Sequence, residues 1–330
     1  MSNKRRAPRR KAKAKAKAPA TKRSEKIPLP PVVDLTQFDV IVVSTSAGKD
    51  SLVALWIVCS MAKRQGVLDR VHAIHCDLGR VEHDGVVELA KRQCAAQGVP
   101  LTVVTRIGQV ATKDSSVYAK GEVYGDLWDY VLRRGAWHSE SCRFCTSEFK
   151  RSPSEKHYTA CAAKWRAMTG EKRAARILDV QGIRAEEAPD TRGARPEHFI
   201  RKENRNQFVS TWYRVHKWTE KQVWACIREN ELEYHPVYDQ GMPRLSCVFC
   251  HYAKNNPDAL RLAGKLYPEK LDAACEVEET LEARKAAAKT QEEADAILPN
   301  FTKNLSLREI REDVKAGKVP EKVSDWEMPY

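Results

Sequence analysis

The chain has 330 residues, of which 42% are hydrophobic and 31% charged, so it is long enough for a catalytic domain with an appended lobe. It has no run of about 18 apolar residues and no apolar segment behind its basic N-terminus, which argues against a membrane protein and leads us to expect a cytoplasmic one. The net charge of +13 is concentrated in residues 1–26, which hold twelve Lys or Arg and one Glu, so only +2 remains for the rest of the chain.

Residues 1–31 are predicted to be a disordered basic arm and linker, because this segment has almost no apolar side chains to bury. An arm of this charge can bind a nucleic-acid backbone with little sequence preference, or it can do no more than keep the protein solvated. We favour the second interpretation and keep nucleic acid as a candidate partner of residues 1–26.

The next part of the chain alternates between strand and helix patterns. Residues 38–43 form a β-branched apolar run that predicts a buried parallel strand, and the apolar spacing after Asp50 predicts a helix that ends near Gly66. The segments VHAIHCDLG and PLTVVTR predict two more strands, with a helix between them that ends near Gly98.

The second part of the chain extends the same pattern. A strand is predicted at residues 175–180 and a further one at 208–213, followed by a helix capped by Thr219 and Gln222. Residues 257–296 suit a helical lobe. The expected fold is α/β, a doubly wound parallel sheet with helices on both faces, divided into domains at 32–252 and 253–330.

Three loops are expected to meet at one edge of this sheet. They begin near Ser44, Asp77 and Gly182, each directly after a predicted strand. Ligands of open α/β sheets bind outside the carboxyl ends of the strands, so these loops indicate a binding site.

The segment Ser44-Thr-Ser-Ala-Gly-Lys-Asp-Ser51 lies between a strand and a helix, where small residues let backbone N–H groups approach a phosphate. Its spacing is not that of a Walker A motif. The pattern S-x-G-K-D-S resembles the PP-loop of ATP pyrophosphatases and phosphoadenosine phosphosulfate (PAPS) reductases. A turn without a ligand is the simpler alternative, but Lys, Asp and Ser occur together in the family order.

The resemblance covers about residues 38–252 and lies near the relatives that act in DNA phosphorothioation. His75-Cys-Asp-Leu-Gly79 is similar to the family's D-T-G strand end, and Cys145, Lys150 and Pro153 match C-x-x-x-x-K-x-x-P. The segment from Gly182 to Arg192 is similar to G-x-R-x-x-E-S-x-x-R, with Ala188 in place of the serine and Arg192 one residue late. A final group of matches runs through Trp218, Val223, Trp224, Pro236, Tyr238, Gly241, Arg244, Cys247 and Cys250.

The resemblance implies a nucleotide site and a set of catalytic residues. Nucleotide contacts are expected from Ser44, Ser46, Gly48, Lys49, Asp50, Ser51, Asp77, Gly79, Gly182, Arg184 and Arg192. The catalytic candidates are Lys49, Asp50, Lys150 and Arg184, with Arg184 as an oxyanion clamp. The expected ligands are ATP or PAPS together with Mg²⁺.

Four of the ten cysteines form two C-x-x-C pairs, Cys142 with Cys145 and Cys247 with Cys250. In a cytosolic chain such pairs more often bind metal than form disulfides. Together they can supply four thiolates to one centre, and sulfur ligands suit zinc or iron and sulfur equally. The family favours a four-iron four-sulfur cluster, with structural zinc as the alternative.

The chain lacks the E-C-G-x-H segment that supplies the nucleophile of assimilatory reductases, and its last cysteine, Cys275, lies in a charged helical pattern. The leading hypothesis is therefore an enzyme that cleaves ATP to AMP and pyrophosphate and activates an acceptor for sulfur transfer. A PAPS or adenosine phosphosulfate (APS) reductase is the second hypothesis, and a nucleic-acid-binding module with a structural metal is the third. The enzymatic hypotheses imply a sulfur donor or a reductant protein as partner.

Overall fold

A six-stranded sheet forms the centre of the computed structural model, which describes residues 33–106, 108–109, 123–139, 141–187, 189–302 and 305–323. The predicted arm at residues 1–31 lies outside these ranges. Asp34–Tyr330 forms one compact unit. The strands follow the order β3-β2-β1-β6-β8-β7 and span β1 (Val40–Ser44), β2 (Val71–Asp77), β3 (Leu101–Thr105), β6 (Ala175–Gln181), β7 (His198–Glu203) and β8 (Gln207–Tyr213).

Five of the six strands run parallel, as predicted, and the sixth differs. β7 pairs antiparallel with β8 at the edge of the sheet, and half of its side chains are exposed. An antiparallel edge strand is common on an otherwise parallel sheet. Because β7 faces water on one side, it lacks the continuous apolar run by which the buried strands were predicted.

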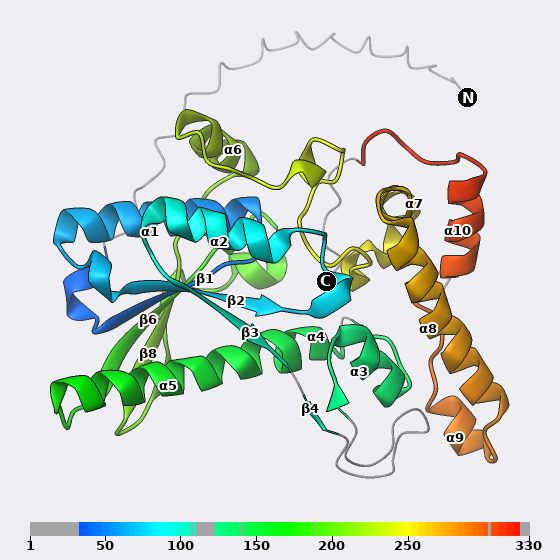
Figure 1. Ribbon diagram of the computed structural model, residues 1–330, viewed down its shortest axis with the longest axis horizontal. Helices are drawn as coiled ribbons and strands as arrows, with labels where there is room; N and C mark the ends of the chain where they lie inside the picture. Colours follow the sequence, from blue (N-terminus) through cyan, green and yellow to red (C-terminus); the bar gives the residue numbers. More distant parts are fainter. Residues whose placement is uncertain are drawn as a thin grey trace, which may run out of the picture. The chain divides into compact units, whose positions relative to one another are not determined.

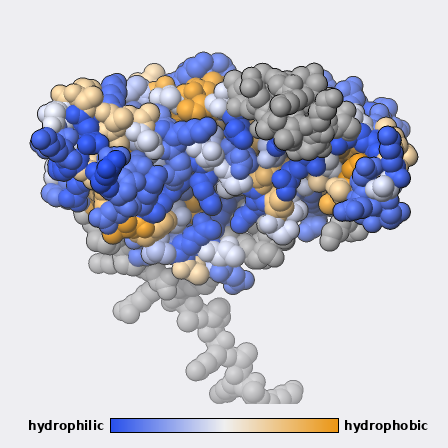
Figure 2. All heavy atoms as spheres, turned by 90° about the horizontal axis from the view of Figure 1, so that it is seen from below, coloured by the Kyte–Doolittle hydropathy of each residue, from blue (hydrophilic) through white to orange (hydrophobic). Residues whose placement is uncertain are grey.

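Helices cover both faces of the sheet, which confirms the doubly wound fold (Figure 1). α1 (Lys49–Gln65) and α2 (Val86–Gln97) lie on one face, with α6 (Glu220–Glu229) packed against α1. α5 (Ser152–Thr169) crosses the other face and contacts β1, β2, β3, β6 and β8. The surface on the α5 side is mostly hydrophilic, with small separate apolar patches (Figure 2).

The predicted helix boundaries are confirmed at two informative places. α1 ends at Gly66, whose φ of +69° is a left-handed conformation that glycine adopts without strain. α6 begins with a capping box in which Thr219 Oγ1 accepts from the Gln222 N–H at 3.3 Å and Gln222 Oε1 accepts from the Thr219 N–H at 2.8 Å.

The segment between β3 and α5 holds β4 (Gly108–Gln109), β5 (Val123–Tyr124), α3 (Leu127–Arg134) and α4 (Phe144–Thr146). A π-helical turn over residues 147–151 joins α4 to α5. Turns of this kind often occur at functional sites.

The expected helices beyond residue 252 are present as α7 (Pro257–Leu266), α8 (Pro268–Ala286), α9 (Gln291–Asp295) and α10 (Leu307–Lys315). Apolar side chains of α7, α8 and α10 share one hydrophobic cluster with residues from α3 and α4. Buried Glu278 accepts the backbone N–H groups of Phe301 at 2.6 Å and Leu307 at 2.9 Å, and so fixes the last segment to α8. The domain boundary at residue 252 stays a prediction. No helix in the described ranges combines the length and the apolar character needed to cross a membrane.

Candidate functional site

The connections of the sheet change direction between β1 and β6. From β1 the strand order continues to β2 and β3 on one side, and from β6 it continues to β8 and β7 on the other. Ser44 and Gln181 are paired at the carboxyl ends of these two central strands. Residues of the loops that follow them line a cavity of 1410 Å³. This is the place where open α/β sheets bind ligands.

Residues 44–51, which the sequence predicts to bind a nucleotide and which we call the nucleotide turn, line this cavity except for Ala47, and the turn is held in shape by its own hydroxyl groups. Ser51 Oγ accepts from the Ser46 N–H at 3.2 Å and donates to the Gly48 carbonyl at 2.9 Å. Ala47 has a φ of +58°, and a Cβ added at Gly48 would lie 3.2 Å from Ser46 Oγ. The turn is therefore preformed, and a side chain at position 48 would have to displace the Ser46 hydroxyl slightly.

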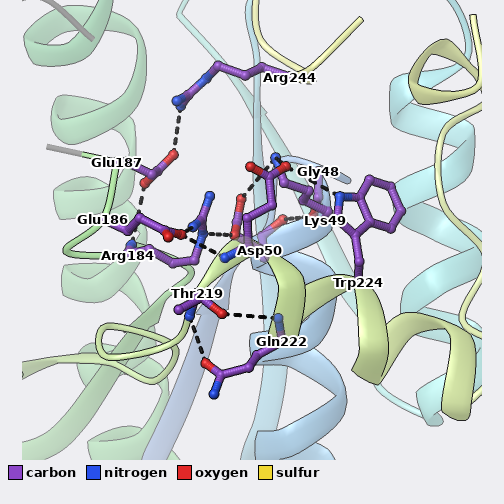
Figure 3. A network of polar contacts seen from close by, with 12 residues as sticks. Gly48, Lys49, Asp50, Arg184, Glu186, Glu187, Thr219, Gln222, Trp224 and Arg244 are labelled. Carbon is purple, nitrogen blue, oxygen red and sulfur yellow. Dashed lines mark hydrogen bonds and ion pairs between the residues drawn. The ribbon is translucent and has the colours of Figure 1, made fainter. Parts of the chain in front are cut away.

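The two charged residues of the turn are paired; Lys49 is buried and Asp50 is half-buried (Figure 3). Lys49 is only 4% exposed, and its Nζ lies 3.2 Å from a Glu220 carboxylate oxygen and 3.1 Å from the Pro243 carbonyl. Trp224 Nε1 donates to Glu220 at 3.3 Å, which holds this carboxylate in place. In this structure Lys49 is therefore engaged by a protein carboxylate at the start of α6, where the sequence predicts a lysine open to phosphate.

Asp50 and Arg184 form an ion pair beside the turn. Burial raises the pKa of Asp50, although Lys49 and Arg184 act to lower it. Arg184 is 4% exposed, also binds Glu186, and does not belong to the described lining of the cavity. Its predicted role as an oxyanion clamp stays a prediction, and the ion pairs it forms here are with Asp50 and Glu186.

A second group of charges centres on Glu187, which occupies the glutamate position of the matched G-x-R-x-x-E motif but was not among the predicted site residues. Its carboxylate accepts from Arg244 at 2.7 Å and from Arg192, and all three side chains line the cavity. Burial alone would raise the pKa of Glu187, but Arg244, Arg192 and Arg184 together hold it below its ordinary value. Arg192, which the sequence predicted as a site residue, thus lines the cavity and pairs with the buried Glu187 carboxylate.

The other predicted nucleotide residues divide into two groups. Ser44 lines the cavity, and its Oγ donates to buried Asp179 at 3.3 Å. Gly182 also lines it, and a Cβ there would lie 2.5 Å from the Ser51 nitrogen, so only glycine lets this loop pack against α1. Asp77 accepts the Gly79 N–H at 2.8 Å, but neither residue belongs to the described lining of the cavity.

Tyr238 contacts the nucleotide turn at Lys49 through both its hydroxyl group and its ring. Its hydroxyl accepts the Lys49 backbone N–H at 3.1 Å, and its ring lies 5.4 Å from Lys49 Nζ. Burial raises its pKa, so the hydroxyl stays protonated and neutral. The sequence matched Tyr238 to a family position but indicated no role for it.

The four cysteines of the two C-x-x-C pairs line the same cavity, and we call them the cysteine wall. An isolated bridge joins Cys247 to Glu82, next to the loop that follows β2, and the Val248 N–H donates to the Val81 carbonyl at 2.8 Å. Burial raises the pKa of Cys247 and of Cys145, and neighbouring Cys250 raises both further. The fold thus brings two pairs that are far apart in sequence to the lining of one cavity, although no three of the four sulfurs lie within 4.8 Å of one another in the described residues.

Two buried histidines accompany the cysteine wall. Donor atoms of His138, Cys145 and His251 all lie within 4.8 Å of one another, and all three residues are buried. His138 Nδ1 and both ring nitrogens of His251 have no hydrogen-bond partner in the described part of the chain. Sequence reasoning missed both residues, although His251 directly follows Cys250.

Lys150, predicted as catalytic, lies beside the cysteine wall. Lys150 is exposed, and it is one of the residues that line the cavity. Nearby protein atoms act to lower its pKa, but Cys247, Cys145 and Glu82 raise the pKa above its ordinary value. Lys150 is therefore a cation that faces the thiols.

The geometry agrees with the comparison to known families. The family model of the phosphoadenosine phosphosulfate reductase domain matches residues 40–253. The chain belongs to this family. The resemblance that the sequence motifs indicated is thereby confirmed.

Individual relatives of this PAPS reductase family member cover less of the chain. The adenosine 5'-phosphosulfate reductase of Lysinibacillus sphaericus is 32% identical over 82 residues, which are 25% of this chain and 34% of that protein, so the match spans about a third of the relative's length. A PAPS reductase from Candida auris, solved as a phosphate complex, has a TM-score of 0.41 at 16% identity and covers 64% of this chain and 83% of its own. The U34-tRNA thiolase NcsA of Methanococcus maripaludis, solved with its [4Fe-4S] cluster, has a TM-score of 0.32 at 14% identity and covers 70% and 72% of the two chains.

Proposed function

We propose that this PAPS reductase family member is an enzyme that binds ATP in the cavity and cleaves its α-β phosphate linkage. An oxygen of the acceptor attacks the α-phosphorus, the bond to the β-phosphate oxygen breaks, and pyrophosphate leaves. A sulfur nucleophile then displaces AMP from the activated acceptor. This reaction depends on positioning and charge stabilisation more than on proton transfer.

One observation supports this proposal most directly. The nucleotide turn and the cysteine wall line a single cavity at the switch point of the sheet, so a nucleotide and a sulfur centre can act on the same acceptor. The described lining also holds nine Lys or Arg and five Asp or Glu, an excess of positive charge that suits a polyphosphate.

In the proposed reaction, different residues of the chain stabilise the phosphates in different ways. The start of α1 directs the partial positive charge of a helix N-terminus at the phosphates. Lys49 and Arg192 supply full charges once the nucleotide competes with Glu220 and Glu187 for them. Mg²⁺ would accompany the phosphates, and Asp50 is the residue predicted to bind it or to support the loop.

The cysteine wall fits a metal centre by the chemistry of its donors. Four thiols line the cavity, and buried His138 and His251 beside Cys145 offer further nitrogen donors. We propose that Cys142, Cys145, Cys247 and Cys250 hold a four-iron four-sulfur cluster, with zinc as the alternative. A cluster at this place would supply electrons or a binding position for sulfur.

Sulfonucleotide reduction remains the second candidate, because curated relatives of this chain are named adenosine 5'-phosphosulfate reductases. That chemistry needs a nucleophilic thiol. Cys275 is fully buried in α8, and burial raises its pKa to about 11, so it is not that thiol. Among the described residues that line the cavity, Cys76 is the one cysteine outside the cysteine wall.

The test compares the products of anaerobically purified protein given ATP or PAPS, with sulfide or a reduced thioredoxin-type protein as partner. AMP and pyrophosphate from ATP support the proposal. Sulfite from APS or PAPS that disappears in Cys76→Ser refutes it and supports the reductase. Polyanion binding that depends on residues 1–26, without turnover of any nucleotide, would instead support a nucleic-acid-binding module.

A further inference from the structure

A second group of metal-ligand side chains lies outside the cavity, between β2 and α5. His72 is the second residue of β2, and His157 and Cys161 are four residues apart on α5. Residues four apart lie on the same face of a helix, and α5 packs against β2. None of the three belongs to the described lining of the cavity.

The donor atoms of these three residues face one another at short distances. The two Nε2 atoms of His72 and His157 are 3.0 Å apart. Cys161 Sγ lies 3.5 Å from His72 Nε2 and 3.4 Å from His157 Nε2. A tetrahedral zinc ion, with bonds of about 2.0–2.1 Å to nitrogen and about 2.3 Å to sulfur, places two nitrogens about 3.3 Å apart and nitrogen and sulfur about 3.5 Å apart. The observed triangle fits that geometry closely.

The surroundings leave room for a fourth ligand. All three residues are half-buried, so one side of the triad is open to water. On the other side, Cys161 packs against an apolar cluster that includes Ile74, Tyr158 and Ala162. Three protein ligands with an open fourth position are a common zinc arrangement, and two imidazoles with a thiolate suit zinc among the available cations.

We propose that His72, His157 and Cys161 bind a zinc ion, with water as the fourth ligand. This site is separate from the cysteine wall and does not depend on the proposed function. Cys76, on the same strand as His72, contacts Ser154 on α5 at 3.6 Å, so the strand and the helix that the ion would join also meet at the cavity. The zinc ion would fix α5 on β2 and thereby fix the start of α5 beside the cavity.

The test measures the binding of Zn²⁺ to the full chain after labile metal has been removed with a chelator. Wild type is expected to bind one more equivalent of Zn²⁺ per chain than either His157→Gln or Cys161→Ser. The iron content and the visible absorption should be equal in wild type and the two variants. Cys226→Ser and His198→Gln, which alter a cysteine and a histidine elsewhere, should retain that equivalent. Zn²⁺ should raise the Tm of wild type and of these two controls more than that of the two site variants.

Cobalt distinguishes this site from the cysteine wall. Co²⁺ should give a thiolate charge-transfer band that disappears in Cys161→Ser and persists in Cys247→Ser. Equal Zn²⁺ stoichiometry in wild type and both site variants would overturn the proposal and leave a hydrogen-bonded triad. Should Cys161→Ser fail to fold, His72→Gln is used in its place. Complete loss of the wild-type Co²⁺ band in Cys247→Ser would also overturn the proposal.

Discussion

The nucleotide turn and the cysteine wall share one cavity but satisfy their polar groups in different ways. Around the turn, Lys49 is paired with Glu220, Asp50 with Arg184, and Glu187 with Arg192 and Arg244. At the wall, four thiols line the cavity, and the buried rings of His138 and His251 have nitrogens without partners in the described part of the chain. The comparison suggests that the turn is stable without its ligand, whereas the wall depends on one, because unpaired buried polar groups are costly.

The largest expected effect comes from Cys247→Ser. Loss of one of four thiolates should remove most of the bound metal and lower the Tm, because metal binding at such a site contributes to folding. Metal analysis and limited proteolysis measure both effects. Cys226→Ser is the control, since its sulfur interacts with the Asn230 side chain on α6, away from the wall. If Cys142→Ser keeps all the metal while Cys247→Ser loses it, the four residues do not share one centre.

Lys49→Ala, in the nucleotide turn, should lower nucleotide affinity strongly and change the Tm little, in contrast to Cys247→Ser. We expect nucleotide affinity to fall about 100-fold, which corresponds to about 2.7 kcal/mol, because a full positive charge at the phosphates is lost. The Tm should change by only a few degrees, since Glu220 is 28% exposed and can be hydrated instead. Titration calorimetry with ATP measures the affinity, and exposed Lys91→Ala is the control. Ser46→Ala should cause a smaller loss. Unchanged binding of ATP and PAPS in both Lys49→Ala and Ser46→Ala would contradict the site.

Glu187→Gln tests whether the ion pairs stabilise the cavity in the absence of ligand. The pKa of Glu187 is depressed in the folded protein, so its contribution is present above the unfolded value of about 4.3 and is lost as pH falls through the folded value. We expect a loss of about 2 kcal/mol at pH 7 that shrinks below about pH 4. Urea unfolding from pH 3 to pH 7 measures it, with exposed Glu171→Gln as the control. A difference that stays constant over this range would contradict the assignment.

The smallest expected effect is an increase in the affinity for ATP. Glu220→Gln removes the carboxylate that holds Lys49, so ATP should bind about threefold more tightly, equivalent to about 0.7 kcal/mol. The same calorimetry measures it, and Glu229→Gln at the other end of α6 is the control. Weaker binding in Glu220→Gln would show that this carboxylate positions Lys49 for the nucleotide.

The sequence predicted the features that depend on local pattern. β1, β2, β3, β6 and β8 were found from apolar runs, α1 and α6 from periodicity and caps, and the turn from its motif. The edge strand β7 was missed because its exposed side chains give no such run. Tertiary partners could not be predicted either: nothing near Arg184 in the sequence indicates that it binds Asp50. His72 and Cys161 have no motif spacing, and only the packing of α5 on β2 joins them.

The bridge between Glu82 and Cys247 has a consequence for how the protein is made. At a synthesis rate of roughly 5–20 residues per second, the second C-x-x-C pair leaves the ribosome roughly ten to thirty seconds after the loop to which it binds. During that interval a nascent chain already carries the nucleotide turn, while its first pair of thiols is exposed to oxidants without partners. The metal centre proposed for these four cysteines could be completed only after Cys250 has emerged, so oxygen during translation would harm such a centre more than oxygen after folding.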